Sequence, residues 1–238
     1  MKNYDYQKKM LSTEQVFQMI KEAIRRGKGL SLIRIGDGET RAIAHNDLIT
    51  MNEVPDWIRY SGVLLPDQAI KKELIASIRR ADIVGLPLEN YYYFKPLMLE
   101  IINKYQISLK QICPNRINYY LFNQGYLRKI IAGHKVIIIG RKAALSSPYF
   151  SQFATVVATY NLPNSFFVNQ LFQQIKEEPA FEIALVAAGI PAVILCPMLA
   201  DLKKVAIDLG HVIDGIVEPE KDLFKLMGEW LENNKPGG

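Results

Sequence analysis

Cysteine is scarce in this chain of 238 residues, which contains only Cys113 and Cys196. Two cysteines without CxxC spacing exclude a disulfide framework and the common structural zinc sites, and they favour a reducing compartment. No stretch approaches the roughly 20 apolar residues that span a bilayer, and the N-terminal residues MKNYDYQKKMLSTEQ lack the apolar segment of a secretory signal. We therefore expect a soluble, cytoplasmic protein in which both thiols are inert core groups.

Signature motifs of several enzyme classes are also missing. The sequence has no GxxxxGK[ST] phosphate loop, no GxSxG nucleophile elbow, no HExxH zinc motif and no GxGxxG loop after a strand. Their absence argues against P-loop nucleotidases, α/β-hydrolases, zinc proteases and proteins with the usual dinucleotide-binding loop.

The composition is that of a folded protein with a basic surface. Hydrophobic residues make up 49% and charged residues 22% of the chain, which favours a packed core over disorder. The length of 238 residues favours one domain over residues 1–238, and we expect frayed ends at 1–11 and 233–238. The net charge of +5 favours an anionic partner, but it does not separate a nucleotide, a nucleic acid and a lipid surface. Only the run Tyr91-Tyr92-Tyr93-Phe94-Lys95 mixes aromatic and basic residues as single-stranded nucleic-acid binders do, and an apolar wall explains it equally well. We expect no nucleic-acid partner, and we leave oligomeric state open.

Apolar runs and helical periodicity alternate along the chain. Residues 12–28 predict a helix that begins with a capping box between Ser12 and Gln15. Further helices are predicted around 39–45, from Pro66 to Arg80, from Pro96 to Tyr105, over 168–177 and from Gly189 to about Lys204. Short apolar runs predict strands at 30–35, 82–86, 135–139, 155–158, 183–187 and 205–209. This alternation predicts an α/β, Rossmann-like fold with a largely parallel sheet and helices on both faces.

Polar or glycine-rich loops follow four of these strands. They are Arg34-Ile35-Gly36-Asp37-Gly38-Glu39, Gly140-Arg141-Lys142, Ala188-Gly189-Ile190 and Gly210-His211-Val212-Ile213-Asp214. In an open parallel sheet, ligands bind beyond the carboxyl ends of the strands, where such loops and helix N-termini converge. We expect all four loops to share one edge.

Two carboxylates lie in the first of these loops. Asp37 and Glu39 are separated by one glycine and flanked by another, so the loop can bend tightly enough for one or both to hold a divalent ion. Mn²⁺ or Mg²⁺ would suit such oxygen ligands, with diphosphate oxygens completing the shell. Arg34 would contact phosphate or restrain a carboxylate. The alternative is that Asp-Gly forms a turn and Asp37 caps the next helix.

The other loops offer cations and a histidine. Arg141 and Lys142 would seat a phosphate at a helix N-terminus, or they are solvated surface cations. His211 suits a metal ligand, a phosphate contact, a general base or a structural role. Asp208 and Asp214 flank His211 and add local acidity. His45 and His134 lack such a setting and are interpreted as structural.

Three segments together resemble a known family. The run Arg34 to Glu39, the run Ala187-Ala188-Gly189-Ile190-Pro191 and the run Ala206-Ile207-Asp208-Leu209-Gly210-His211 resemble the GT-D type glycosyltransferases, in order and over nearly the whole chain. The sequence departs from the usual pattern at Arg141-Lys142 after Gly140, and at Ile190.

The resemblance implies a Rossmann-like enzyme that moves a sugar from a nucleotide donor, typically UDP-linked, with a divalent metal at Asp37 and Glu39. Donor phosphate contacts would come from Arg34, Gly36, Gly38, Gly140, Arg141, Lys142 and Gly189. His211 would lie beside them, and Asp214 is a candidate base.

The expected acceptor is a glycan on a protein or lipid, and peripheral membrane association would be compatible with it. The loops 47–65, 88–95 and 113–124 are candidates for acceptor choice. A methyltransferase-like or other nucleotide-dependent transferase, and a non-catalytic module that binds an anionic ligand, remain as alternatives.

Overall fold

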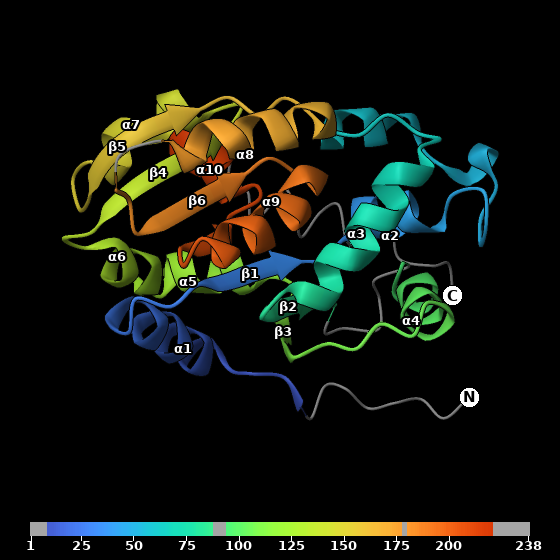
Figure 1. Cartoon of the computed structure of the whole chain (residues 1–238), viewed down its shortest axis with the longest axis horizontal. Coiled ribbons are helices and arrows are strands. Elements are labelled where there is room, and N and C mark those ends of the chain that lie inside the picture. Colours follow the sequence, from blue (N-terminus) through green and yellow to red (C-terminus); the bar gives the residue numbers. More distant parts are fainter. Residues whose placement is uncertain (1–8, 88–93, 178–179, 221–238) are drawn as a thin grey trace.

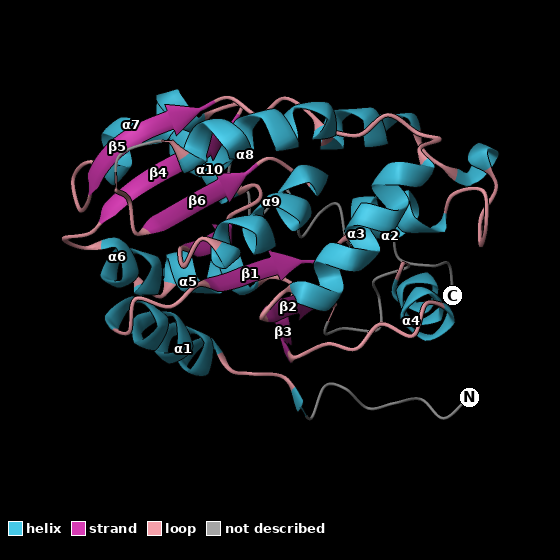
Figure 2. Cartoon of the chain, viewed as in Figure 1, coloured by secondary structure: helices cyan, strands magenta, loops and turns pink. Residues whose placement is uncertain are grey.

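The computed structural model describes residues 9–87, 94–177 and 180–220. Its centre is a seven-stranded sheet in which every neighbouring pair is parallel, in the order β3-β2-β1-β7-β6-β4-β5. The strands, shown in magenta in Figure 2, are β1 (Leu30–Arg34), β2 (Ile83–Leu86), β3 (Gln111–Pro114), β4 (Lys135–Gly140), β5 (Thr155–Tyr160), β6 (Ile183–Ala187) and β7 (Val205–Asp208).

Helices cover both faces of the sheet (Figure 1). One face packs against α2 (Asp37–Ala44), α3 (Gln68–Arg80), α4 (Lys95–Lys104), α8 (Val168–Lys176) and α9 (Ile190–Asp201). The other packs against α1 (Thr13–Arg25), α5 (Ile117–Asn123), α6 (Tyr126–Ile131), α7 (Ala143–Phe150) and α10 (Val212–Val217). The predicted α/β fold with helices on both faces is confirmed.

The central strands are apolar on both sides because each side faces a core. In β4, Ile137 and Ile139 pack into the core of the α9 face, whereas Val136 and Ile138 pack into the core of the α1 face. All four side chains are fully buried. This two-sided burial explains the unbroken apolar run that predicted the strand.

All six predicted strands are present, and β3 is an addition. The interpretation of residues 113–124 as a loop is wrong, because they form the end of β3 and helix α5. Strand β3 has only four residues and begins with the exposed Gln111, so it lacks the apolar run of the other strands. Helix α5 buries Ile117, Tyr119 and Leu121, so Tyr119 belongs to the core.

The first helix begins as the sequence predicts. The Ser12 side chain accepts a hydrogen bond from the Gln15 N–H, and the Gln15 side chain accepts one from the Ser12 N–H. Just before it, the Leu11 N–H donates to the Ile112 carbonyl at 2.8 Å, which ties this end of the chain to β3. Residues 1–8, 88–93 with Tyr91, Tyr92 and Tyr93, and 233–238 lie outside the described residues.

Both cysteines are buried and free, which confirms their prediction as core groups, and burial raises the pKa of the Cys113 thiol to about 12. Among the described residues, no helix is long and apolar enough to cross a membrane.

Candidate active site

Four strand-end loops meet at one edge of the sheet. Strands β1, β7, β6 and β4 are consecutive neighbours and run parallel, so their carboxyl ends lie side by side, as predicted. The chain leaves β1 toward α2 on one face and leaves β7 toward α10 on the other face. Adjacent strands whose connections diverge in this way form the crevice in which open α/β sheets bind ligands.

Asp37 and Glu39 lie on the first turn of α2 rather than in a loop. The Gly36 N–H donates to Glu39 Oε2 at 2.8 Å, and the Thr40 N–H donates to the Gly36 carbonyl at 3.1 Å. The helix therefore starts at Asp37, two residues before the predicted start. Glu39, and not Asp37, makes the capping contact.

The Asp37 carboxylate is held by a cation one helical turn away. Arg41 Nε donates to Asp37 Oδ1 at 2.7 Å, and Arg41 Nη1 donates to the Glu53 carbonyl at 2.8 Å. Both ionic side chains are largely buried. Arg41 thus orients Asp37 and ties α2 to the 3-10 helix η2 (Met51–Glu53).

The Glu39 carboxylate is incompletely compensated. Burial raises the pKa of Glu39, and the nearby Asp208 charge acts in the same direction, against hydrogen bonds from the backbone N–H groups of Glu39 and Gly36 and the charge of Arg34. A cation beside this carboxylate would favour its charged form.

The residues of this turn fit a divalent metal ion. Asp37 and Glu39 supply hard oxygen donors. Among the described residues, no three His, Cys, Asp or Glu side chains are grouped to hold a metal. Mg²⁺-type sites commonly use one or two carboxylates and take their other ligands from substrate phosphate and water, so the two carboxylates suit an ion that arrives with a diphosphate.

Arg34 is joined to the end of β7. Its Nη2 donates to Asp208 Oδ1 at 3.0 Å, and the Gly210 N–H donates to the same oxygen at 2.9 Å. Burial alone would lower the pKa of Arg34, but the charge of Asp208 and the hydrogen bond to it outweigh burial and raise this pKa. Of the two roles considered for Arg34, this geometry supplies the restraint of a carboxylate.

Gly210 permits this contact. Its φ is +48°, and a Cβ at this position would lie 1.9 Å from Arg34 Nη2. The glycine next to His211 is therefore needed for the close approach of the guanidinium.

Lys142, Asp214 and His211 form a second cluster, between the ends of β4 and β7. Lys142 Nζ lies 2.7 Å from Asp214 Oδ1 and 3.0 Å from Glu218 Oε1, and His211 Nδ1 lies 2.8 Å from Asp214 Oδ2. Partial burial alone would raise the pKa of Asp214, but the hydrogen bonds with His211 and Lys142 outweigh it and lower this pKa. Two carboxylates thus balance the Lys142 charge, whereas the His211 ring is exposed.

Arg141 and two of the predicted glycines contact the segment that precedes α3. Arg141 Nη2 donates to the Tyr60 carbonyl at 2.6 Å in the 3-10 helix η3 (Asp56–Ser61). A Cβ at Gly189, where φ is +64°, would lie 2.5 Å from the Ser61 carbonyl oxygen, and one at Gly38 would touch Ile190 and Ser61. Helix η3 therefore lies against the loops after β1, β4 and β6, as part of the predicted acceptor loop 47–65. Gly140, the remaining predicted glycine, lies against the Ala187 carbonyl.

Sequence reasoning missed Arg41 and the contact that Asp208 makes at this edge. Arg41 is signalled only by its i,i+4 spacing from Asp37 on a helix. Asp208 was noted as a source of acidity, but its partner Arg34 is 174 positions away in the chain, and no local pattern reports such a pair.

The other two histidines have structural contacts, as expected. In the buried His45 ring, Nδ1 lies 2.7 Å from the Ala42 carbonyl oxygen and Nε2 accepts a hydrogen bond from the Asp67 N–H at 3.1 Å. His134 pairs with Glu182 at 2.9 Å.

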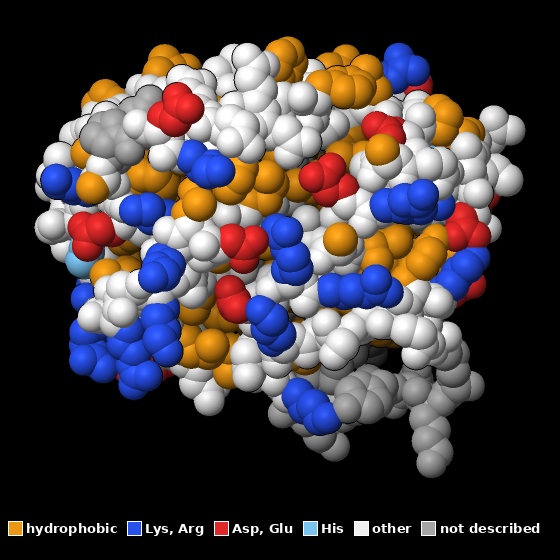
Figure 3. Space-filling view, viewed as in Figure 1, with side chains coloured by type: hydrophobic (Ala, Val, Ile, Leu, Met, Phe, Trp, Pro, Cys, Tyr) orange, Lys and Arg blue, Asp and Glu red, His pale blue; other side chains and the backbone are white. Residues whose placement is uncertain are grey.

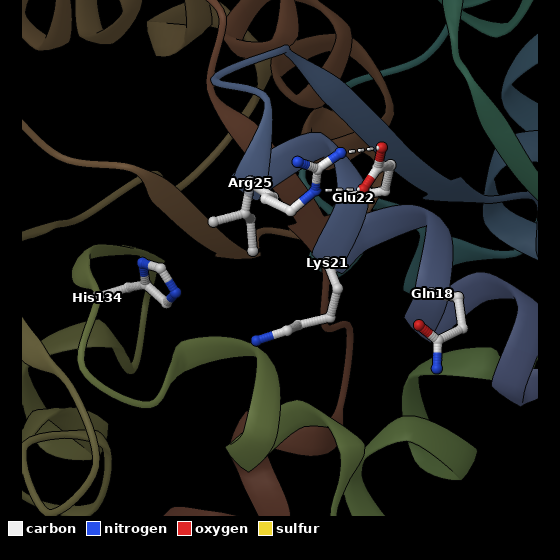
Figure 4. A pocket seen from close by; sticks show the side chains of 6 residues that line it. Gln18, Lys21, Glu22, Arg25 and His134 are labelled. Atoms are coloured by element: carbon white, nitrogen blue, oxygen red, sulfur yellow. Dashed lines mark hydrogen bonds and ion pairs between the residues drawn. The ribbon is translucent and has the colours of Figure 1, made fainter.

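A hollow of about 580 Å³ lies away from this site, between α1 and the residue before β4. Figure 4 shows Lys21 and His134 approaching it from facing segments, with Arg25 bonded to Glu22. The hollow is at the amino ends of the strands and contains none of the predicted site residues. The candidate site is therefore placed by the chemistry of the residues at the carboxyl ends of the strands, and this hollow is not part of it.

Comparison with known proteins gives a family and a fold. The family model of the GT-D-like group, described as a GT-D fold-like domain, matches residues 11–216. Among curated protein sequences, none matches the chain.

Solved structures of similar fold extend over most of the chain. A glycosyltransferase of the domain of unknown function 1792 from Streptococcus sanguinis is 15% identical, with a TM-score of 0.63, and the match covers 92% of this chain and 85% of that one. A domain of unknown function 1792 described as having a distinct glycosyltransferase fold is 17% identical, with a TM-score of 0.63 and coverage of 92% and 82%. At these identities the likeness shows a shared fold.

Proposed function

The chain belongs to the GT-D-like family of glycosyltransferase-fold domains, and from this premise we propose that it transfers a sugar from a nucleotide-sugar donor, with UDP-hexose as the expected class, to a glycan acceptor. The proposed reaction depends on Mn²⁺ or Mg²⁺ held by Asp37 and Glu39. No observation on the described residues favours the methyltransferase-like or the non-catalytic alternative.

The observation that supports this proposal best is the position of Asp37 and Glu39. They occupy the first turn of α2, at the crevice between β1 and β7 where ligands of open α/β sheets bind. A helix N-terminus favours anionic groups, and two carboxylates there repel a bare diphosphate. A diphosphate accompanied by a divalent cation satisfies both. When bound, such an ion supplies stabilisation of the negative charge that develops on the departing diphosphate.

In this proposal, the basic side chains at the carboxyl edge of the sheet have different roles. Arg141 is exposed and is the cation best placed to contact a donor phosphate. Arg34 fixes the end of β7 through Asp208, and Lys142 fixes Asp214. We infer that Arg34 and Lys142 act as positioning residues.

His211 is a better candidate base than Asp214. Both Asp214 oxygens are engaged, one with Lys142 and one with His211 Nδ1, and its pKa is lowered. Asp214 can hold the ring so that Nε2 faces solvent at the site edge, where it would accept the proton of an acceptor hydroxyl if the reaction inverts the anomeric carbon.

A substitution at Asp37 tests the proposal. Asp37→Asn keeps a side-chain oxygen for Arg41 but loses the charge, so transfer should fall by about 100-fold or more. Sugar transfer from UDP-hexoses with Mn²⁺ measures the effect, and Asp201→Asn, at an exposed aspartate at the end of α9, is the matched control. A folded Asp37→Asn protein with wild-type activity would refute the catalytic assignment.

Metal dependence is tested on the unaltered protein. A chelator should abolish transfer, and Mn²⁺ or Mg²⁺ should restore it. In a thermal-shift assay, UDP with metal should raise the melting temperature more than UDP alone. Transfer that continues in the chelator would exclude the metal clamp while leaving the family assignment intact.

A further inference from the structure

Large hydrophobic side chains that remain exposed gather on one side of the candidate active site. Within the described residues they are Trp57, Tyr60, Leu64, Leu145, Phe166 and Phe167, which we call the apolar rim. Tyr60, Leu145 and Phe166 are 75%, 67% and 61% exposed. Such a group is unusual, because soluble monomers rarely expose large apolar side chains together without an interaction to serve.

Hydrogen bonds join the three segments that bear the apolar rim. Arg141 Nη2 donates to the Tyr60 carbonyl, and one turn beyond Arg141 the helix α7 carries Leu145. The Ser165 N–H, at the start of the 3-10 helix η4 (Ser165–Phe167), donates to the Gly62 carbonyl at 2.8 Å. The rim therefore follows the carboxyl edge of the sheet beside the site.

The chain around the apolar rim is almost free of charge. Residues 143–175, which include α7, β5, η4 and most of α8, contain no Asp, Glu, Lys, Arg or His. Apart from the internally paired Lys142, the charged side chains near the rim are Asp56 and Arg59 on η3, Arg141 before α7, and Lys176 and Glu177 at the end of α8. Arg59 is the exposed cation that lies within the rim itself, between Trp57 and Tyr60. Figure 3 shows hydrophobic side chains recurring along the upper border of the view, over α7, α8 and the segment with η3.

This combination matches the chemistry of a bilayer interface. Trp and Tyr rings favour the headgroup level, Phe and Leu insert below it, and Arg side chains pair with lipid phosphates. A surface without charge can enter the interface without the cost of desolvating ions. The exposed Arg59 within the rim and the net charge of +5 of the chain complement anionic lipids.

We propose that the apolar rim docks the protein on the surface of an anionic membrane, with Arg59 beside the lipid phosphates. Combined with the proposed function, on which this step rests, docking would bring the site edge to an acceptor glycan that is anchored in the same membrane.

Vesicle binding tests the docking. The probe is a suspension of phosphatidylcholine vesicles with about one quarter phosphatidylglycerol, at about 0.1 M salt, with pure phosphatidylcholine for comparison. The wild-type protein should sediment with the anionic vesicles. The triple substitution Leu145→Ser, Phe166→Ser and Phe167→Ser should weaken binding by at least about tenfold, because three insertable side chains are lost.

Charge variants separate a specific contact from general attraction. Arg59→Gln should weaken binding to anionic vesicles, whereas Lys28→Gln, which removes one exposed cation at the amino end of β1, should leave it unchanged. If the triple variant misfolds by circular dichroism, Phe166→Ser alone and Arg59→Gln still decide the outcome.

Three results would overturn the proposal. The first is a wild-type protein that does not bind anionic vesicles, and the second is binding that Lys28→Gln weakens as much as Arg59→Gln. The third is a concentration-dependent dimer that the triple variant abolishes without any vesicle binding, which would make the rim a self-association surface. Asp37→Asn should bind vesicles normally, and the triple variant should keep its activity on a lipid-free acceptor, so failure of docking and failure of catalysis are distinguishable.

Discussion

At the scale of single residues, Glu39 of α2 has opposite consequences for stability and for the proposed reaction. Glu39 starts the helix by accepting the Gly36 N–H, yet burial raises its pKa. A buried charge that lacks full compensation lowers the stability of the protein that contains it. In the proposed function, the Glu39 charge thus lowers the stability of the protein without metal and is the charge that the metal ion would bind.

Glu39→Gln should separate the two roles. The amide oxygen still accepts the Gly36 N–H, and the buried charge is gone, so the urea midpoint without metal or nucleotide should rise while sugar transfer is lost. The pKa of Glu39 is raised in the folded protein. Its contribution to the free energy of unfolding of the wild-type protein therefore falls as the pH rises through that pKa. This fall should be missing in the variant. A lower midpoint for Glu39→Gln at neutral pH would contradict the explanation.

His45 gives a pH effect of the opposite sign. Burial, followed by the charge of Lys71, lowers its pKa against the effect of the Ala42 carbonyl, and Nε2 accepts the Asp67 N–H only when it is unprotonated. The unfolded chain therefore binds more protons than the folded one below pH about 6.5, and stability should fall as pH drops through that region. Urea midpoints measured between pH 7.5 and 5.5 should decline less in His45→Gln than in the wild-type protein, and an equal decline in both would contradict this explanation.

At the scale of elements, the glycine after β7 decides how closely β1 and β7 can be tied. Gly210 and Gly125 both have positive φ, +48° and +71°, but a Cβ at Gly125 meets nothing within 4 Å, whereas one at Gly210 would strike the Arg34 guanidinium. Comparing an alanine at Gly210 with an alanine at Gly125 therefore separates the effect of the contact with Arg34 from the effect of backbone strain.

Gly125→Ala should lower the free energy of unfolding by about 1 kcal/mol, the ordinary cost of a left-handed alanine. Gly210→Ala should cost about 1–3 kcal/mol more and should also reduce sugar transfer, since Arg34 must leave Asp208. Chemical unfolding of the two variants measures the difference. Equal costs would mean that Arg34 moves aside freely.

Elements with a strong local signal could be predicted from the sequence. Strand β4 is an unbroken apolar run, and α1 carries its capping box, so both were found with nearly correct bounds. Strand β3 and helix α5 were missed because their pattern is short and their burial depends on partners elsewhere.

In the candidate site too, the features with a local sequence signal were predicted, and the contacts between distant residues were not. The four loops were predicted because parallel strands place their ends together. The pairing of Arg34 with Asp208, and of Lys142 with Asp214, joins residues far apart in the chain. Only the folded structure shows that two of the predicted phosphate cations are engaged in this way.

At the scale of the whole molecule, two cores share one sheet. Leu74 in α3 and Leu121 in α5 are fully buried on opposite faces. If residues 1–238 fold as one domain, the protein should unfold in a single transition. Leu74→Ala and Leu121→Ala should then each lower the free energy of unfolding measured from that transition by about 2–5 kcal/mol. Leu145→Ala, at an exposed position, should change it by less than about 0.5 kcal/mol. Two separate transitions, each sensitive to one variant, would contradict a single domain.

The order of the strands has a consequence for the newly made chain. Strand β7, the last strand of the sheet in chain order, fills its middle and joins β1 to β6. Until residues 205–208 leave the ribosome, the chain holds two three-stranded fragments, each with an unpaired inner edge that invites aggregation. Translation that stops before Val205 should therefore yield insoluble protein, and no nascent chain shorter than this has both halves of the Arg34–Asp208 bridge.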